Sequence, residues 1–471
     1  MSELLVVGGG VAGLSAAMLL ARDGHRVTVL ERDPAPPPSP ERAWSGWERR
    51  GVTQFRLPHL FLARFTEILT AEAPDVLAAL EDAGAFRSNR ILQLPESVPG
   101  GRRPGDERFD QVTGRRPLVE AVLAAVAEAE RGVVVRRGVA VRGLATDDAP
   151  RGEHPRVRGV VTDAGETIEA DLLIDASGRR SRLPDWLEAA GAPVPSEERA
   201  DGGSIYYGRH YRSPDGAMPA MLAPPLQPYR SLSIVTLVAD NGHWSVVIYG
   251  SAKDRLLRGA AHADVWEALV RSYPLAAHWT DAEPVTGIDV MANIPDRVRR
   301  YDPAAAASGV VAIGDASACT NPSLGRGASF ALLHAVTLRD VLREVGLHDR
   351  HAFADTWQQA AAERVEPLVD DTLRADRHRR AQIEVELTGR EYRTDDPAWN
   401  VGTALMAAAP HDPEVLRAAM AVGGALERGV DALRRPGVME AITRLGPLPP
   451  LPGPDRGEVE AIIEEASRQA A

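Results

Sequence analysis

The order of apolar and polar positions at the start of the chain predicts a βαβ unit. Residues 3–7 form a short apolar run that ends in three glycines, and residues 11–24 then repeat apolar side chains at helical spacing. Residues 25–32 form a second strand-like run. A helix-spaced segment between two strand-like runs is typical of parallel sheets with helices on their faces. We therefore expect an α/β fold.

Helix-like and strand-like segments continue along the chain. Amphipathic helical spacing covers residues 59–84 and 115–131. Short apolar runs over 132–178 and 309–317 predict further strands, and the chain is mostly helical from about residue 326 onward. The pattern therefore predicts a mixed fold with a C-terminal helical region.

The clearest hairpin lies between these parts. Residues 203–212 and 231–250 are long runs rich in β-branched and aromatic side chains. Asn241-Gly242 interrupts the second run, and this dipeptide favours the positive φ angles of a tight hairpin turn. We expect an antiparallel sheet here, and a proline-rich linker at 447–455 before a terminal helix.

The glycine cluster between the first strand and the first helix carries the strongest chemical signal. Gly8, Gly10 and Gly13 have the spacing of a dinucleotide-binding turn, and Glu31 ends the second strand. Such a turn allows backbone N–H groups and the helix N-terminus to face a pyrophosphate, while the acidic residue accepts hydrogen bonds from a ribose. We predict a Rossmann-like cofactor site here, which also includes the adjoining residues Val11, Ala12 and Arg32.

Two later turns extend this site. Asp175 and Gly178 follow a predicted strand, and Gly314-Asp315 follows another. A turn with three small or rigid residues then precedes a predicted helix, namely Pro322, Gly325 and Gly327. A strand-end aspartate can bind a polyol, and N–H groups at a helix start can face a polar ring edge. Together these turns suggest one extended ligand and distinguish FAD from NAD.

Composition narrows the class of protein. The 471 residues contain 54 Lys+Arg and 66 Asp+Glu, which gives a net charge of −12 and disfavours nucleic-acid binding. The chain has one lysine, Lys253, and one cysteine, Cys319, so it has neither a disulfide nor a zinc-ribbon ligand set, and we expect no metal. We see no signal peptide or membrane-length apolar run and expect a cytoplasmic protein without stable membrane insertion.

Up to about residue 350 these motifs occur in an order that resembles the FAD-dependent oxidoreductases of the p-hydroxybenzoate hydroxylase fold. That group includes aromatic hydroxylases, squalene epoxidase and bacterial polyether epoxidases, and the last are the nearest in character. The resemblance implies that Arg116 lies near the pyrophosphate and that Gln111 contacts the flavin. It further implies that Asp315 holds the ribityl chain. In the segment GVTQFRLPHLFL, it makes Arg56 and His59 candidates beside the flavin.

The same resemblance predicts how the chain divides into domains. The FAD-binding domain is expected to be discontinuous, with a separate substrate domain and the helical region at the end. The expected boundaries are 1–75, 100–180 and 285–350 for the FAD-binding domain, 76–99 and 185–284 for the substrate domain, and 351–471 for the helical region.

Some positions depart from the family pattern. Ala318 stands where many aromatic hydroxylases have histidine, and Pro184 stands where an arginine is usual in the segment associated with NADPH. This weakens the expectation of direct reduction by NADPH. Flavin halogenases need a lysine and a Trp-x-Trp-x-Ile-Pro segment. Lys253 falls just after the hairpin and that segment is absent, so we do not expect halogenation.

The catalytic residues cannot be named from the sequence. His59, His210 and Tyr211 are candidates, although sheet packing explains the last two equally well. For Cys319 we prefer a packed thiol to a covalent flavin link. We also expect Trp244 and Tyr249 to lie in the core. The pair Arg299-Arg300 is expected to be solvated.

The resemblance implies a monooxygenase that binds FAD noncovalently and transfers one oxygen atom from O₂ to a small molecule through a flavin C4a-hydroperoxide. The expected reaction is epoxidation or hydroxylation of a secondary metabolite. NADPH or NADH would be the transient reductant, with a separate flavin reductase as the alternative electron source. Two other functions stay open, a flavin-dependent reductase or dehydrogenase similar to geranylgeranyl reductase and a non-catalytic flavin-binding protein.

Overall fold

A parallel sheet forms the centre of one end of the molecule. The computed structural model describes residues 1–147, 154–200, 202–302 and 307–470. The strand order is β18-β9-β1-β2-β5, and every pairing in this sheet is parallel. The strands are β1 (Glu3–Val7), β2 (Arg26–Glu31), β5 (Val133–Arg137), β9 (Leu172–Asp175) and β18 (Val310–Ala312). Helix α1 (Val11–Arg22) joins β1 to β2, which confirms the predicted βαβ unit.

Both faces of this sheet are covered, as a parallel sheet with apolar strands requires. On one face, α1, α9 (Gly327–Val345) and α10 (Arg350–Arg364) pack through residues such as Leu19, Leu338 and Trp357. On the other face lie the antiparallel strands β6 (Val141–Thr146), β7 (Val157–Thr162) and β8 (Thr167–Glu169), with α7 (Leu183–Ala189).

The segment 59–84 forms two helices rather than one. Helix α3 (Ala63–Glu72) ends just before Pro74, which begins α4 (Pro74–Asp82), because proline has no N–H to continue a helix. Both helices pack against α6 (Arg116–Ala129) through a shared apolar cluster. Most of helix α4 lies in the segment 76–99, yet its apolar face packs with α3 and α6 beside the parallel sheet.

An antiparallel sheet forms the second layer of the molecule. Its order is β12-β13-β14-β11-β15, with β16 also paired to β11. The strands are β11 (Ser204–Arg212), β12 (Leu226–Pro228), β13 (Ser233–Val238), β14 (His243–Ser251), β15 (Glu283–Pro284) and β16 (Asp289–Ala292). The predicted hairpin is confirmed, since β13 and β14 pair through a turn in which Asn241 has φ 52° and Gly242 has φ 72°.

Shorter elements connect the two large sheets. They are α2 (Pro40–Gly46), α5 (Arg90–Gln93), α8 (Ala263–Arg271), β3 (Phe86–Ser88), β4 (Gln111–Thr113), β10 (Ser196–Ala200), β17 (Asp296–Arg300) and β19 (Ala318–Cys319). Strand β3 pairs with β4, and β17 pairs with both β10 and β19. The polar segment between the predicted helices therefore contains a short helix, α5, as well as strands.

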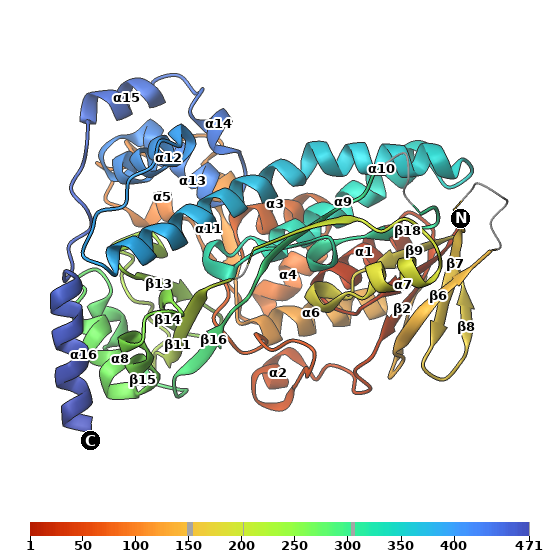
Figure 1. Cartoon of the computed structure of the whole chain (residues 1–471), viewed down its shortest axis with the longest axis horizontal. Coiled ribbons are helices and arrows are strands. Elements are labelled where there is room, and N and C mark those ends of the chain that lie inside the picture. The colour runs from red at the N-terminus through yellow and green to blue at the C-terminus, as the bar shows by residue number, and fades with distance from the viewer. Residues whose placement is uncertain (148–153, 201, 303–306, 471) are drawn as a thin grey trace.

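The C-terminal region is helical, as predicted, but it does not form one separate unit. Its long helix α11 (Glu366–Glu386) crosses from the parallel sheet to the far end of the molecule (Figure 1). There α12 (Pro397–Ala408), α13 (Pro413–Gly423), α14 (Gly429–Ala432) and α15 (Val438–Leu445) share their own apolar cluster. The terminal helix α16 (Arg456–Ala470) packs on α8 beside the antiparallel sheet.

Candidate functional site

One large cavity joins the two sheets and the C-terminal helices. Its volume is about 1980 Å³. We call one part the dinucleotide end, which is lined by Gly8–Ala12, Glu31–Asp33, Ser177–Arg180 and Asp315. We call the other part the apolar chamber, which is lined by residues 218–226, Leu237, Trp399, Leu405 and Met420.

The glycine turn at the dinucleotide end has no room for side chains at two positions. Gly8 has φ 110°, and a Cβ there would lie 2.4 Å from the carbonyl oxygen of Ala176. A Cβ on Gly13 would lie 1.9 Å from the carbonyl oxygen of Gly8. This close packing of α1 on β1 turns the first N–H groups of the helix toward the cavity, where they can face an anion.

Glu31 lies at the centre of a buried network of charges. It accepts hydrogen bonds from the backbone N–H of Gly9 (3.1 Å) and of Asp33 (2.9 Å), and it forms an ion pair with Arg49. Arg49 also pairs with Glu120, and Glu120 pairs with Arg116. These two guanidinium groups hold the pKa of the Glu120 carboxyl below its usual value despite burial. The network fixes Glu31 at the edge of the cavity.

Asp315 lies on the opposite wall of the dinucleotide end. Its backbone oxygen accepts a hydrogen bond from Arg297 (2.8 Å), but no described residue donates one to its carboxylate. Burial raises the pKa of the Asp315 carboxyl, and Arg116 partly opposes this rise. Uncommitted carboxylate oxygens on a cavity wall are suited to bind ligand hydroxyl groups.

His59 lies beside Arg116 on the cavity wall. Its Nδ1 is 2.7 Å from the carbonyl oxygen of Leu57, and its Nε2 is 3.4 Å from Nη1 of Arg116. Burial and the neighbouring guanidinium lower the pKa of His59 to about 3. The imidazole is therefore neutral near pH 7, with Nδ1 donating to the carbonyl and Nε2 accepting from Arg116.

Most of the predicted cofactor residues line the cavity. They are Gly8, Gly10, Val11, Ala12, Glu31, Arg32, Gln111, Arg116, Gly178, Asp315, Pro322, Gly325 and Gly327. Gly13 and Gly314 lie behind this wall, where Gly13 packs on β1 and Gly314 takes a φ of 58°. Arg56 is also off the wall, and its Nη2 donates to the carbonyl oxygen of Trp47 (3.2 Å).

Asp175 is placed differently from the prediction. Its carboxylate accepts hydrogen bonds from the backbone N–H of Ser177 (3.0 Å) and from the hydroxyls of Ser177 and Ser181. The side chain is 1% exposed and does not line the cavity. Because neighbouring groups already satisfy this carboxylate, it stabilises the turn after β9 and is not positioned to bind a ligand.

Two of the three catalytic candidates are also away from the cavity. His210 is buried with Nε2 3.0 Å from the carbonyl oxygen of Arg56, and burial lowers its pKa to about 4. Tyr211 packs between the rings of Trp244 and Trp266 in the core of the antiparallel sheet. The alternation of strand β11 turns both side chains into packed layers, so only His59 stays on the wall.

The other sequence expectations have mixed outcomes. Cys319 and Trp244 are buried, as predicted, and burial raises the pKa of the Cys319 thiol. Tyr249 is also buried, but it lines the cavity. The expectation for Arg299 is wrong, because it is 6% exposed and donates to the carbonyl oxygens of Ala316 and Ser181.

Sequence reasoning missed the polar residues of the chamber. Asp376 on α11 is buried at the cavity wall, accepts a hydrogen bond from the Ser323 hydroxyl, and has one oxygen without a described partner. Burial and the nearby Asp296 raise the pKa of the Asp376 carboxyl to about 7. Arg90 on α5 also lines the cavity. No local motif marks either residue, because each reaches the chamber only through the fold.

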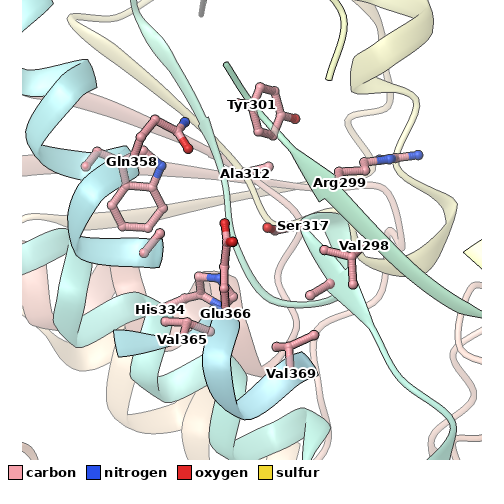
Figure 2. A pocket seen from close by; sticks show the side chains of 13 residues that line it. Val298, Arg299, Tyr301, Ala312, Ser317, His334, Gln358, Val365, Glu366 and Val369 are labelled. Atoms are coloured by element: carbon pink, nitrogen blue, oxygen red, sulfur yellow. The ribbon is translucent and has the colours of Figure 1, made fainter. Parts of the chain in front are cut away.

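The protein also contains two smaller spaces. Figure 2 shows one behind β18, lined by His334, Tyr301 and Glu366; its volume of about 20 Å³ is room for about one water. The other, about 430 Å³, adjoins the main cavity and is lined by Arg179, Arg180 and Arg297. Among the described residues, no group of three or more His, Cys, Asp and Glu side chains is arranged to hold a metal.

None of the helices in the described ranges has both the length and the apolar character needed to cross a bilayer. The single lysine, Lys253, is exposed and pairs with Glu384 at 2.9 Å. It does not line the cavity.

Comparisons with known proteins agree with this geometry. The FAD-dependent oxidoreductase family matches residues 3–103, and the FAD-binding domain family matches residues 113–372, more than half of the chain. Protein Rv3254 of Mycobacterium tuberculosis is 30% identical over 72% of this chain and 72% of its own length. Aklavinone 12-hydroxylase of Streptomyces peucetius subsp. caesius is 30% identical over 39% of this chain and 37% of its own length.

Solved structures give the same fold. PqsL of Pseudomonas aeruginosa, whose description names an FAD-dependent monooxygenase, matches with a TM-score of 0.60 at 17% identity, over 81% of this chain and 96% of its own. The fold is thus the Rossmann-like FAD-binding fold of p-hydroxybenzoate hydroxylase-type enzymes, with a C-terminal helical region. This chain belongs to the FAD-binding domain family of FAD-dependent oxidoreductases, which has flavin monooxygenases among its members.

Proposed function

We propose that the protein is a monooxygenase that inserts one oxygen atom from O₂ into an apolar secondary metabolite, by hydroxylation or epoxidation. The observation that carries the proposal is the continuity of the cavity. Its dinucleotide end opens directly into the apolar chamber. A substrate in the chamber would therefore meet the reactive ring of a cofactor held at the other end.

The residues of the dinucleotide end fit FAD. Gly8–Ala12 would face the pyrophosphate, and Glu31 would face an adenosine ribose. Asp315 would face the ribityl hydroxyls, because no described residue donates a hydrogen bond to its carboxylate. The turn from Pro322 to Gly327 would lie along the ring. When bound and reduced, FAD would supply the electrons that activate O₂, and O₂ is the source of the oxygen atom that is transferred.

The chain's own contribution is to position the substrate and to exclude water. Residues 218–226 and the helices α12 and α13 supply a mostly apolar wall around the chamber. Such a wall lowers the local water content, which protects a reactive oxygen species from unproductive decay. His59 holds Arg116 through Nε2 and stays neutral, so we assign it positioning and not proton transfer.

The relatives support hydroxylation of a natural product more directly than polyether epoxidation. One relative is an aklavinone 12-hydroxylase, and its match covers 39% of this chain. The chamber also suits a large apolar substrate, because Met218, Met221, Trp399 and Met420 contribute polarizable side chains to its wall.

For the electron source we propose direct reduction by NADPH or NADH. The groove beside the main cavity is lined by Arg179, Arg180 and Cys319, which also line the main cavity. Guanidinium groups there can bind the phosphates of a transient dinucleotide. The test is anaerobic bleaching of bound FAD by NADPH or NADH without a partner. Bleaching that needs an added flavin reductase would support a two-component enzyme instead.

The proposed reaction is tested with ¹⁸O₂ and the FAD-loaded protein. A panel of polycyclic aromatic and polyene natural products is incubated with NADPH, and products are examined by mass spectrometry. We expect one product that gains a single ¹⁸O atom. Oxidation without ¹⁸O would favour a dehydrogenase, a product with two added hydrogens would favour a reductase, and bound FAD without any turnover would favour a non-catalytic flavin-binding protein.

A further inference from the structure

The arginines that line the cavity differ in which neighbouring groups compensate their positive charge. Arg49 and Arg116 pair with buried glutamates, and Arg428 pairs with Asp371 at 3.0 Å. Arg326 donates to the Thr372 hydroxyl, and Arg379 donates to backbone oxygens such as that of Tyr229. A buried cation is normally compensated in this way, because an uncompensated one is costly.

Arg90 is the exception on the wall of the chamber. Among the described residues, none forms a hydrogen bond or an ion pair with its guanidinium, although the side chain is only partly exposed. Desolvation lowers the pKa of Arg90 to about 10, and no carboxylate opposes this effect. The other cavity arginines without a described partner are Arg32, Arg180 and Arg374, and all three are exposed to water.

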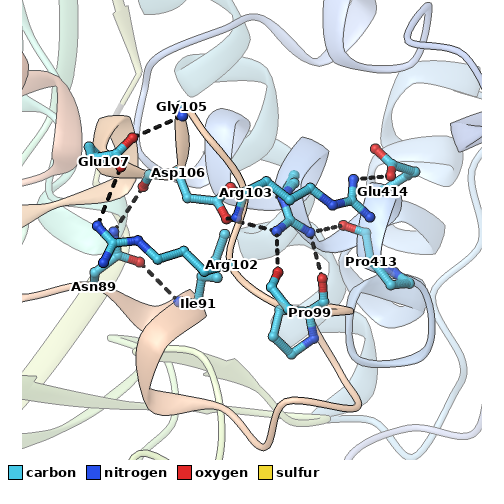
Figure 3. Close-up of polar contacts among 12 residues, drawn as sticks. Asn89, Ile91, Pro99, Arg102, Arg103, Gly105, Asp106, Glu107, Pro413 and Glu414 are labelled. Atoms are coloured by element: carbon cyan, nitrogen blue, oxygen red, sulfur yellow. Dashed lines mark hydrogen bonds and ion pairs between the residues drawn. The ribbon is translucent and has the colours of Figure 1, made fainter.

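The backbone that carries Arg90 is held firmly. Asn89 caps α5 by accepting a hydrogen bond from the N–H of Ile91 (3.1 Å), and its amide donates to Asp110 and to the backbone oxygen of Asp106, both at 2.8 Å. Figure 3 shows Asn89, Asp106 and Glu414 in this set of contacts, which link the segment around α5 to α13. These hydrogen bonds therefore fix the backbone position of Arg90 relative to the chamber.

The position of α5 indicates that Arg90 contacts the substrate and not FAD. Ile91 packs with Phe109 and with Ala421 of α13, so α5 belongs to the chamber side. In Figure 1, α5 lies beside α13, away from α1 and β2, which carry the glycine turn and Glu31. Phe86, Gln93 and Phe109 line the same cavity as Arg90, so the cation is set among mostly apolar groups.

From these contacts we infer that Arg90 is an anion-binding residue of the chamber, and that the substrate is an apolar molecule that carries a carboxylate or an ionised hydroxyl. This inference deepens the proposed function and rests on it only in treating the chamber as the substrate site. A planar guanidinium can bind a carboxylate through two parallel N–H bonds, and a low-polarity wall strengthens such a pair.

The test uses two probes that share a ring system and differ in charge. These are 8-anilinonaphthalene-1-sulfonate, which is anionic, and N-phenyl-1-naphthylamine, which is neutral. Each is titrated into FAD-loaded protein and followed by its fluorescence. We expect Arg90→Gln to weaken binding of the anionic probe about 10- to 100-fold, as loss of a charge-assisted hydrogen bond predicts. Binding of the neutral probe and the FAD content should change less than about twofold, within the scatter of a neutral surface substitution.

Two control variants sharpen the result. Arg90→Lys keeps the charge and should retain most of the preference for the anionic probe. Arg374→Gln removes an exposed arginine from the same cavity and should leave that preference intact. The inference is overturned if the wild-type protein shows no preference for the anionic probe, or if Arg90→Gln weakens both probes equally or leaves both unchanged.

It is also overturned if Arg90→Gln lowers FAD affinity, since the residue would then serve the cofactor. None of these readouts requires turnover. The ¹⁸O₂ experiment can therefore fail while the chamber still prefers the anionic probe. Equally, ¹⁸O can be incorporated while the chamber shows no charge preference.

Discussion

The two ends of the cavity meet a ligand in different ways. At the dinucleotide end, the buried cations Arg49 and Arg116 are neutralised by Glu31 and Glu120 before any ligand arrives. In the apolar chamber, none of the described residues neutralises Arg90 in this way. The first arrangement leaves ligand affinity to backbone geometry and to the carboxylates of Glu31 and Asp315. The second leaves a charge for the ligand itself to satisfy.

The backbone shows the same difference. Gly13 packs so closely on β1 that a Cβ would overlap the Gly8 carbonyl oxygen. Gly402, in helix α12 of the chamber, has no atom within 4 Å of the position that a Cβ would occupy. The dinucleotide end therefore tolerates almost no change in the main-chain path, whereas the chamber wall has free space toward its ligand.

We expect the largest effects on FAD binding and stability from substituting these two glycines, one at each end of the cavity. We expect Gly13→Ala to abolish FAD binding and to lower the melting temperature, because α1 must move away from β1. Gly402→Ala should retain FAD and raise stability by about 0.5–1 kcal/mol, the usual gain of alanine over glycine within a helix. Flavin absorbance after gel filtration and thermal melting measure both outcomes. Retention of FAD by Gly13→Ala would contradict the assignment of the turn.

The next effect concerns how the chamber is fixed to the rest of the molecule. Buried Arg417 on α13 donates to both oxygens of Asp106 at 2.8 Å and to the backbone oxygen of Pro99 at 2.7 Å. Arg417→Met leaves Asp106 buried and unpaired, so we expect a loss of about 3–5 kcal/mol in the free energy of unfolding. FAD affinity should change little, because the dinucleotide end does not include these residues.

Arg103 provides the matched control for this measurement. It pairs with Glu414 in the same region, but the two side chains are 39% and 48% exposed. Arg103→Met should therefore cost at most about 1 kcal/mol. Urea unfolding of the two FAD-loaded variants gives the comparison, and equal losses would show that burial of the Arg417 pair does not matter.

The same contrast explains what the sequence could predict. The glycine turn, Glu31 and Asp315 follow strand ends, so a few neighbouring residues specify them, and they line the cavity. Their role as cofactor ligands stays a prediction. The chamber is assembled from α5, residues 218–226, α11 and α12, which are distant in the sequence. Arg90 and Asp376 carry no local signal, since one is an ordinary arginine and the other lies within a long polar helix.

Asp175 shows why a correct pattern can still give a wrong role. It stands at the end of β9, as a polyol-binding aspartate would. Ser177 and Ser181 follow closely enough to donate their hydroxyls to it, so its acceptors are used within the turn. For a related reason, the sequence left open whether His210 and Tyr211 are site residues or packed residues. A strand pattern fixes alternation, but it does not show which layer each face meets.

Asp315 should produce a smaller effect that is confined to the dinucleotide end. Asp315→Asn is expected to weaken FAD binding about 10- to 100-fold, through the loss of charge-assisted hydrogen bonds worth roughly 1.5–3 kcal/mol. The FAD-free protein should be no less stable, because burial already disfavours this carboxylate. Fluorescence titration with FAD and thermal melting test the two parts, and an unchanged affinity would contradict the proposed contact.

The smallest expected effect is a dependence of stability on pH that arises in the chamber. Asp376 has a pKa raised from 3.8 to about 7 by burial and by Asp296, while Ser323, Arg326 and Arg380 act in the opposite direction. Between these two values the folded protein keeps a proton that the unfolded chain releases. Stability therefore falls as pH rises from about 4 to 7, with no further loss from this group above that range.

Asp376→Asn should remove this contribution, so that its melting temperature changes less between pH 4.5 and 7.5 than that of the wild-type protein, by about 1–3 °C. Asp185→Asn is the control, because Asp185 is an exposed aspartate outside the cavity wall. Melting curves of FAD-loaded proteins across this range supply the data. If Asp376→Asn keeps the wild-type slope, the carboxyl is ionised in the folded protein, and the chamber then holds a buried negative charge to set against the positive charge of Arg90.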